Sequence, residues 1–221
     1  MNCFSAVIFD LDGTLVDSAE GILASLAAAF QLNQMQPVRA LTAEVIGPPL
    51  LPTLKFLSGV EDPLLLTKLA DDFMGHYDSE GYRNTRAYSG ADELLVGLRA
   101  TGLRLFIATN KRHIPTERIL DLLGWHHLFE ASVSLDTPQL PVTTKGALLR
   151  YLLGRFALSA TTTLYAGDRY EDEVAAAQAD LAFFRAIWGY ESNNATPSPL
   201  CGNMAALAAL LHIDQSAIAK H

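Results

Sequence analysis

Residues 8–18 read Ile-Phe-Asp-Leu-Asp-Gly-Thr-Leu-Val-Asp-Ser. They begin inside the apolar run Ala6–Phe9, which has the composition of a buried strand in a parallel sheet. Asp10 and Asp12 follow, and because strand side chains alternate, both carboxylates point to the same side. Like charges this close repel unless a cation or a shared proton relieves them. The stretch therefore predicts a site for a hard, oxygen-liganded metal ion, with an ordinary Asp12-Gly13 turn as the simpler interpretation.

The composition is that of one large globular domain, or of one domain that carries an insertion. The chain has 221 residues, half of them hydrophobic, and a chain of this length buries about 70% of its unfolded surface. Its net charge of −8 and scattered basic residues argue against nucleic acid or a membrane surface as partner.

Several absences bear on where the protein works. Cys3 and Cys201 are expected to be reduced thiols, and the N-terminus lacks the pattern of a signal peptide. No apolar stretch is long enough to cross a bilayer. We therefore expect a soluble, cytoplasmic protein, a monomer or small homo-oligomer.

Strand-like runs alternate with helical patterns, which is typical of a parallel sheet covered by helices on both faces. The expected strands are Ala6–Phe9, Leu103–Ala108, Ser132–Leu135, Thr162–Ala166 and Phe183–Trp188. The expected helices of this part are Gly90–Ala100, Pro115–Leu123, Lys145–Phe156, Asp172–Ala179 and Asn203–Leu211, and Asn193–Cys201 is expected to be a loop. Ligands of such sheets bind at the carboxyl ends of the strands.

The segment after the first strand is different. It holds the helical patterns Ala19–Leu32, Leu50–Leu57 and Leu64–Tyr82, broken by prolines, and no convincing strand. We therefore predict the α/β class, with a Rossmann-like parallel-sheet core of residues 1–16 and 87–221 and an inserted α-helical cap of residues 17–86.

Four more polar side chains are expected at the same edge of the sheet. Thr109 and Asp168 end strands, Asp172 opens a helix, and Lys145 lies in the first turn of another helix. The simpler interpretations are strand ends, a helix cap and a surface lysine. Together, however, they would give carboxylates for a metal and a hydroxyl with an ammonium for an anion. That combination suits phosphoryl transfer.

With these residues the chain resembles the haloacid dehalogenase superfamily of aspartate-nucleophile hydrolases, in particular the phosphoglycolate-phosphatase-like branch with a helical cap. Four motifs carry the resemblance: Asp10-Leu11-Asp12-Gly13-Thr14, Ala108-Thr109-Asn110-Lys111, Lys145, and Gly167-Asp168 with Asp172. It extends from about Val7 to Tyr190. Arg169 departs from the pattern, since relatives commonly carry a small hydroxyl residue there.

The resemblance implies a role for each matching residue. Asp10 would attack phosphorus and form an aspartyl-phosphate. Asp12 would protonate the leaving oxygen and later take a proton from water. Thr109, Asn110 and Lys145 would hold the phosphoryl group.

The resemblance also implies a Mg²⁺ site. Its ligands would be the Asp10 side chain, the Asp12 backbone carbonyl and Asp168. Asp172 would act from behind these ligands or by orienting Lys145.

Selection of the substrate would fall to the cap. Gly47-Pro48-Pro49-Leu50 resembles the cap segment that faces the substrate, and Lys55 could contact an anionic group, although a surface lysine is the simpler interpretation. The implied substrate is a small phosphorylated metabolite. Phosphoglycolate is the first candidate, while sugar phosphates, nucleotide monophosphates and pyrophosphate stay open.

The acid at position 12 separates the chemistries of the superfamily. The dehalogenase and phosphonatase branches lack it, so Asp12 favours hydrolysis of a phosphate ester. Two alternatives remain: a sugar-phosphate mutase resembling β-phosphoglucomutase, and a non-catalytic phosphate-binding regulator. The intact set of aspartates argues against the second.

Overall fold

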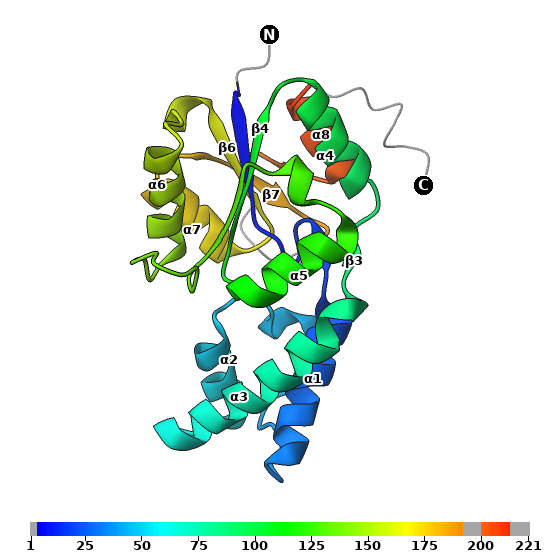
Figure 1. Cartoon of the computed structure of the whole chain (residues 1–221), viewed down its shortest axis with the longest axis vertical. Coiled ribbons are helices and arrows are strands. Elements are labelled where there is room, and N and C mark those ends of the chain that lie inside the picture. The colour runs from blue at the N-terminus through cyan, green and yellow to red at the C-terminus, as the bar shows by residue number, and fades with distance from the viewer. Residues whose placement is uncertain (1–3, 192–199, 213–221) are drawn as a thin grey trace.

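Six parallel strands form the main sheet, and helices cover both of its faces (Figure 1). The computed structural model describes residues 4–191 and 200–212. The strands are β1 (Ala6–Phe9), β4 (Arg104–Thr109), β5 (Ala131–Ser134), β6 (Thr163–Gly167), β7 (Ala182–Ala186) and β8 (Cys201–Gly202). Their order is β5-β4-β1-β6-β7-β8, and all neighbours are parallel. The predicted α/β class with a Rossmann-like core is confirmed.

The register of the three central strands brings their carboxyl ends together. Phe9, the last residue of β1, is opposite Ile107 of β4 and Ala166 of β6. Strand β4 ends two residues beyond this level and β6 one residue beyond it. The polar residues that end or follow these strands therefore meet at one edge of the sheet.

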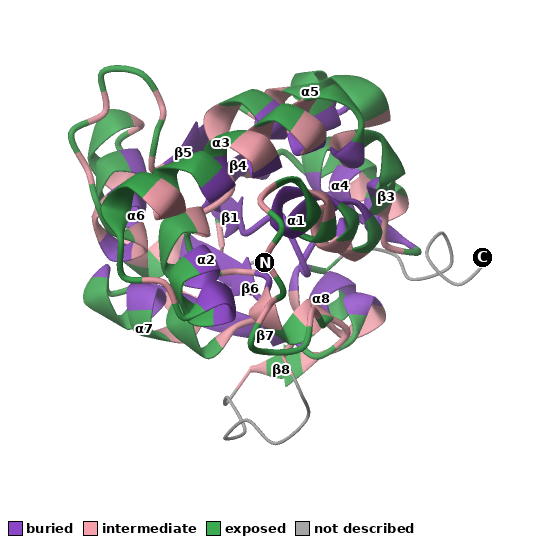
Figure 2. Cartoon of the chain, turned by 90° about the horizontal axis from the view of Figure 1, so that it is seen from below, coloured by how far each residue is buried: buried purple, intermediate pink, exposed green. Residues whose placement is uncertain are grey.

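Each face of the sheet packs against its own set of helices. Because strand side chains alternate, Val7 and Phe9 belong to one buried cluster, and Ala6 and Ile8 to the other. The helices are α4 (Ala91–Ala100), α5 (His113–Leu123) and α8 (Met204–Leu210) on one face, and α6 (Lys145–Arg155) and α7 (Tyr170–Gln178) on the other. In Figure 2 the central strands are buried, while the outer sides of these helices are exposed.

The remaining helices form a separate lobe below the sheet edge in Figure 1. This helical lobe, residues 18–85, contains α1 (Ala19–Leu32), the 3₁₀ turn η1 (Ala43–Val45), α2 (Leu50–Ser58), α3 (Pro63–Ser79) and the 3₁₀ turn η2 (Gly81–Asn84). Its own buried cluster includes Leu26, Phe30, Leu54 and Phe73.

A short antiparallel pair joins the lobe to the rest of the molecule. Strands β2 (Val16–Asp17) and β3 (Arg86–Ala87) pair Val16 with Ala87 and Asp17 with Arg86. The chain therefore leaves for the helical lobe and returns from it at adjacent points.

The predicted elements agree with the structure to within three residues at each end. The first helix of the lobe has the predicted bounds, but α3 ends at Ser79 instead of Tyr82. There the chain turns at Gly81, whose carbonyl packs so closely against Gly21 that a Cβ on Gly21 would lie 1.9 Å from it. Close packing of two backbones, which periodicity does not reveal, ends this helix early.

Two predictions fall at least partly outside the described residues. Cys3 lies there, so its redox state stays a prediction, whereas Cys201 is an exposed free cysteine. Residues 193–199 of the predicted loop Asn193–Cys201 also lie there, and the unpredicted strand β8 begins at Cys201. In the described ranges, no helix has both the length and the apolar character that a membrane span requires.

Candidate active site

The carboxyl ends of β1, β4 and β6 carry the candidate site. Asp10 directly follows β1, Thr109 is the last residue of β4, and Asp168 directly follows β6; all three are at most 3% exposed. Lys145 opens α6, whose N-terminus is capped by the hydroxyl of Thr144. The structure thus brings together these four residues, as the sequence predicted.

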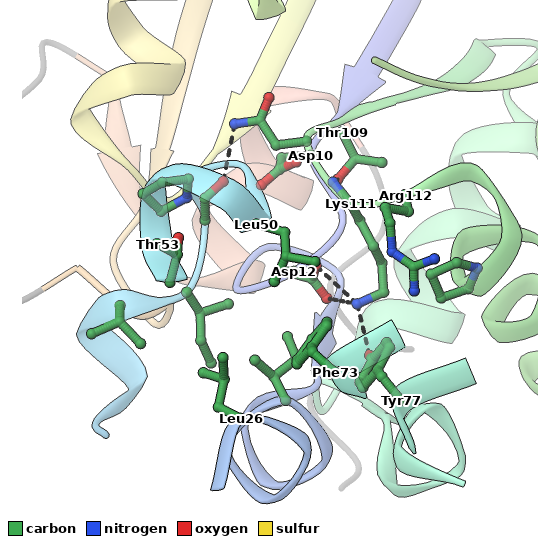
Figure 3. A pocket seen from close by; sticks show the side chains of 17 residues that line it. Asp10, Asp12, Leu26, Leu50, Thr53, Phe73, Tyr77, Thr109, Lys111 and Arg112 are labelled. Atoms are coloured by element: carbon green, nitrogen blue, oxygen red, sulfur yellow. Dashed lines mark hydrogen bonds and ion pairs between the residues drawn. The ribbon is translucent and has the colours of Figure 1, made fainter. Parts of the chain in front are cut away.

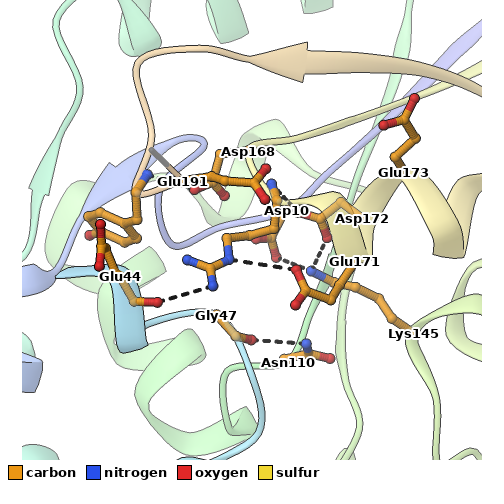
Figure 4. Close-up of polar contacts among 12 residues, drawn as sticks. Asp10, Glu44, Gly47, Asn110, Lys145, Asp168, Glu171, Asp172, Glu173 and Glu191 are labelled. Atoms are coloured by element: carbon orange, nitrogen blue, oxygen red, sulfur yellow. Dashed lines mark hydrogen bonds and ion pairs between the residues drawn. The ribbon is translucent and has the colours of Figure 1, made fainter. Parts of the chain in front are cut away.

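Three buried carboxylates lie close together, and the Lys145 ammonium is paired with two of them (Figure 4). Oxygen atoms of Asp10, Asp168 and Asp172 lie within 4.8 Å of one another. Lys145 Nζ is 2.5 Å from Asp172 Oδ1 and 2.9 Å from Asp10 Oδ1. The buried Asp10 Oδ1 nevertheless accepts no well-aligned hydrogen bond. This cluster places three acids against one cation.

The pKa values record this excess of negative charge. Burial raises the pKa of Asp10 to about 6, with Lys145 opposing the rise and Asp172 adding to it. Burial and the charges of Asp10 and Asp172 raise the pKa of Asp168 to about 8. Burial acts to lower the pKa of Lys145, but the two neighbouring carboxylates raise it above its usual value.

A divalent cation bound among the oxygens of Asp10, Asp168 and Asp172 would relieve the repulsion between these carboxylates, and carboxylates are the ligands that Mg²⁺ prefers. The residues fit a Mg²⁺ site.

Neighbouring backbone holds Asp168 in place. The Tyr190 N–H donates to its Oδ2 over 2.8 Å, and the Thr14 hydroxyl lies 3.4 Å from its Oδ1. Gly13 has a φ of +82°, and a Cβ at that position would lie 2.4 Å from Asp168 Oδ2. Only glycine meets both conditions, so the Asp12-Gly13 turn serves the close approach to this carboxylate.

Asp12 points away from this cluster, toward the helical lobe (Figure 3). Its carboxylate lies 3.0 and 3.1 Å from Lys111 Nζ and accepts a 2.5 Å hydrogen bond from Ser18. The same ammonium lies 2.7 Å from the hydroxyl of Tyr77 on α3. Burial opposes a charged Lys111, but Asp12 and Tyr77 raise its pKa. One lysine therefore connects the sheet edge, Asp12 and the helical lobe.

A pocket of about 80 Å³ lies between the sheet edge and the helical lobe (Figure 3). The sheet side contributes mostly polar residues and the lobe mostly apolar ones. The lining residues are Asp10, Asp12, Ile22, Leu26, Val45, Ile46, Gly47, Pro48, Leu50, Thr53, Phe73, Tyr77, Thr109, Asn110, Lys111, Arg112 and Pro115. Asp10 and Asp12 thus face the same partly open pocket.

The family of haloacid dehalogenase-like hydrolases matches residues 7–186. The chain belongs to this family. Among its relatives, a phosphoglycolate phosphatase from Cereibacter sphaeroides is 34% identical over 192 residues, covering 83% of this chain and 85% of the relative. A 5′-nucleotidase from Pseudomonas aeruginosa is 30% identical over 212 residues, covering 93% of this chain and 94% of the relative.

The tyrosine-protein kinase PtkA from Mycobacterium tuberculosis is 32% identical over 189 residues. That match covers 83% of this chain but 62% of PtkA, so the chain spans less than two thirds of this relative. The solved structure of a predicted phosphoglycolate phosphatase from Haemophilus somnus matches with a TM-score of 0.83 at 26% identity, covering 95% of this chain and 99% of that one. The resemblance inferred from the four motifs is confirmed.

One side chain to which the hydrolase family implied a phosphate-binding role, Asn110, contacts the helical lobe. The Asn110 amide donates to the Gly47 carbonyl over 3.0 Å. Gly47 and Pro48 line the pocket, whereas Pro49 does not. Lys55 lies outside it, with its side chain 53% exposed and paired with Glu61 at 2.6 Å, as expected of a surface lysine.

Arg169, which departs from the hydrolase pattern, forms another contact with the lobe. Its guanidinium donates to the Glu44 carbonyl over 3.1 Å and packs beside Gly47. The residue that replaces a small hydroxyl next to Asp168 thus reaches the segment from Glu44 in η1 to Gly47. Together with Asn110, it fastens this segment over the candidate site.

Sequence reasoning assigned no role to Lys111 and Tyr77. Lys111 ends the second motif, two residues after Thr109, and this proximity was a usable signal. Nothing in the pattern of α3 distinguishes Tyr77 from a core aromatic, because its ring also stacks on Phe73 at 5.5 Å. Only the packing of the lobe against the sheet edge brings the two residues together.

Proposed function

We propose that this protein is a Mg²⁺-dependent phosphatase that hydrolyses a small phosphorylated metabolite through an aspartyl-phosphate. One observation carries the proposal: the buried cluster of Asp10, Asp168, Asp172 and Lys145 borders a pocket that also contains Asp12. Phosphatases among the relatives support the same class of reaction. A site that only bound phosphate would have no need for so many carboxylates.

In the first half of the reaction, a carboxylate oxygen of Asp10 attacks phosphorus. The bond between phosphorus and the alcohol oxygen breaks, and the phosphoryl group is transferred to Asp10. Lys145 offsets charge on the phosphoryl oxygens. The hydroxyl oxygen of Thr109 accepts a hydrogen bond from the Lys111 backbone N–H at 3.1 Å, which leaves its proton free to donate to one of those oxygens.

Asp12 moves the proton in both halves of the reaction. In its protonated form it donates to the departing alkoxide, and as a carboxylate it then accepts a proton from the attacking water. Water attack on the phosphorylated Asp10 releases inorganic phosphate and restores the carboxylate. Ser18 and Lys111, which contact Asp12 in the structure, would hold it in position for these transfers.

Asp10 and Asp168 would hold Mg²⁺, with Asp172 beside them, and the Asp12 backbone carbonyl is the further ligand that the family implies. When bound, the ion supplies positive charge to the phosphoryl oxygens. The fold keeps the three carboxylates close together and places Lys145 between Asp10 and Asp172.

We also propose that residues 17–86 act as a cap that selects the leaving group. The separate buried cluster of the helical lobe, the pairing of β2 with β3 where the chain enters and leaves the lobe, and the pocket between lobe and sheet edge support this division. The core would then comprise residues 1–16 and 87–221.

Phosphate release from a panel of small phosphate esters, with Mg²⁺ and with EDTA, tests the proposal. We expect Mg²⁺-dependent release from at least one ester, and a phosphorylated Asp10 peptide in rapidly quenched samples analysed by mass spectrometry. Interconversion of sugar phosphates without free phosphate would instead identify a mutase. Undiminished release in EDTA would contradict the metal assignment.

A further inference from the structure

The wall that the helical lobe turns toward Asp12 is almost entirely apolar. Ile22 and Leu26 come from α1, Leu50 from α2 and Phe73 from α3, and Val45 lies in η1. A leaving group that Asp12 protonates must lie on the lobe side of the phosphoryl group. It would therefore be in contact with this wall.

The cations at this pocket are already paired. Lys111 and Arg112 are its only basic lining residues in the part of the chain that the structure describes, and both come from the sheet side. Lys111 is bound to Asp12. Arg112 forms a two-pronged ion pair with Asp78, with one N–H donating over 2.9 Å.

The lobe's own basic side chains lie elsewhere. Lys55 is paired with Glu61 on the surface, and Arg39 stacks on the Phe56 ring at 4.2 Å from its centroid. Within residues 17–86, all of which the structure describes, no Lys, Arg or His lines the pocket. The lobe thus offers no counter-charge to an anionic leaving group.

We propose that the leaving group is a small uncharged alcohol, which excludes phosphoglycolate and pyrophosphate as preferred substrates. This inference rests on the proposed phosphatase function and specifies its substrate class. A carboxylate or a second phosphate on the leaving group would lie against apolar side chains near Asp10 and Asp12, without a free cation. An uncharged group with a short carbon chain loses little hydration there and gains contact with Leu26 and Phe73.

A matched pair of esters tests the proposal directly. Phosphoglycolate and 2-hydroxyethyl phosphate have the same carbon chain and differ in the charge of the leaving group. We expect kcat/KM for the uncharged ester to be greater by about 100-fold, because like charges juxtaposed in a binding site are strongly disfavoured. Equal or greater kcat/KM for phosphoglycolate would overturn the inference and leave the phosphatase function standing. Release from neither ester, nor from any other in the panel, would overturn both.

Two variants supply the missing cation. Val45→Arg places a guanidinium on the half-buried turn at the pocket wall, and Asp78→Asn releases Arg112 from its partner. In each variant we expect the ratio of kcat/KM for 2-hydroxyethyl phosphate to kcat/KM for phosphoglycolate to fall by about 10-fold.

Val38→Arg is the matched control, because Val38 is 66% exposed and lies outside the pocket. It should leave the preference unchanged. A preference that Val45→Arg and Asp78→Asn both leave intact would show that wall charge does not select the substrate, and would overturn the inference.

Discussion

The sheet edge and the helical lobe line the same pocket, but the sheet edge carries many charged groups and the wall of the lobe is almost entirely apolar. At the sheet edge, the ends of parallel strands and the start of α6 bring Asp10, Asp168 and Lys145 together. The burial and mutual repulsion of the carboxylates raise the pKa values of Asp10 and Asp168. The lobe presents Leu26 and Phe73 to the same space. Under the proposed function, we expect chemistry to depend on groups that the backbone fixes, and selection to depend on lobe side chains that can be exchanged with little effect on the sheet.

The sharpest test of the sheet edge is Asp10→Asn. The amide keeps the size of the side chain but cannot attack phosphorus, so we expect a loss in kcat of about 10⁴-fold or more. Phosphate release with the preferred ester measures it, and circular dichroism checks that the variant is folded. Substantial residual turnover in this variant would contradict the covalent mechanism.

Lys145→Ala should have the next largest effect. It removes the ammonium that neutralises Asp10 and Asp172 and would offset charge on the phosphoryl group, so we expect turnover to slow by about 100-fold. Arg150→Ala on the same helix is a control, because its side chain is exposed and donates a hydrogen bond to the Gln178 carbonyl. Steady-state kinetics of both variants would separate loss of charge at the site from a general effect on α6. Wild-type kinetics in Lys145→Ala would contradict a role for this ammonium in phosphoryl transfer.

Tyr77→Phe tests the contact between the two regions. It removes the hydroxyl that lies 2.7 Å from Lys111 but keeps the ring and the apolar wall. We expect kcat to fall by about 10-fold, as for loss of a hydrogen bond to a charged group, with KM for an uncharged ester little changed. Tyr151→Phe, at a half-exposed position on α6, is the matched control. Equal effects of the two changes would argue against a functional role for this contact.

A smaller effect is expected on thermal stability. In the metal-free protein the folded-state pKa values of Asp10 (about 6) and Asp168 (about 8) exceed the ordinary pKa of an aspartate, about 3.9. The folded state therefore binds more protons than the unfolded chain between about pH 4 and pH 8. Stability is therefore lost as the pH rises through this range. We expect Tm measured in EDTA to be a few degrees higher at pH 6 than at pH 8.5.

Mg²⁺ should reverse this trend, raising Tm most at pH 8.5, where both carboxylates are ionised. Asp168→Asn should weaken both the pH dependence and the response to Mg²⁺. A Tm that Mg²⁺ leaves unchanged at every pH would contradict the proposed metal site.

The sheet edge could be predicted from the sequence because its residues follow from local patterns. An apolar run ending in Asp10 and Asp12 marks a strand end, and Thr109 and Asp168 mark two more. Parallel strands then bring such ends together whatever the side chains between them. Lys145 could be placed because a capped helix start fixes it near that edge.

The contacts with the helical lobe could not be predicted in this way. Asn110 and Gly47 are 63 residues apart, and Lys111 and Tyr77 are 34 apart. No periodicity links them, since each contact depends on how the lobe packs against the sheet edge. The early end of α3 at Ser79 has the same origin, in the close approach of Gly21 and Gly81.

The pairing of β2 with β3 has a consequence for how such a molecule can change. Because Asp17 and Arg86 are partners in one ladder, the two ends of the lobe are a single strand spacing apart. An insertion with adjacent ends can be exchanged, lengthened or shortened without shifting the register of the main sheet. A different lobe, with a different wall facing the pocket, could therefore be inserted at this two-residue ribbon while Asp10, Asp168 and Lys145 stay where they are.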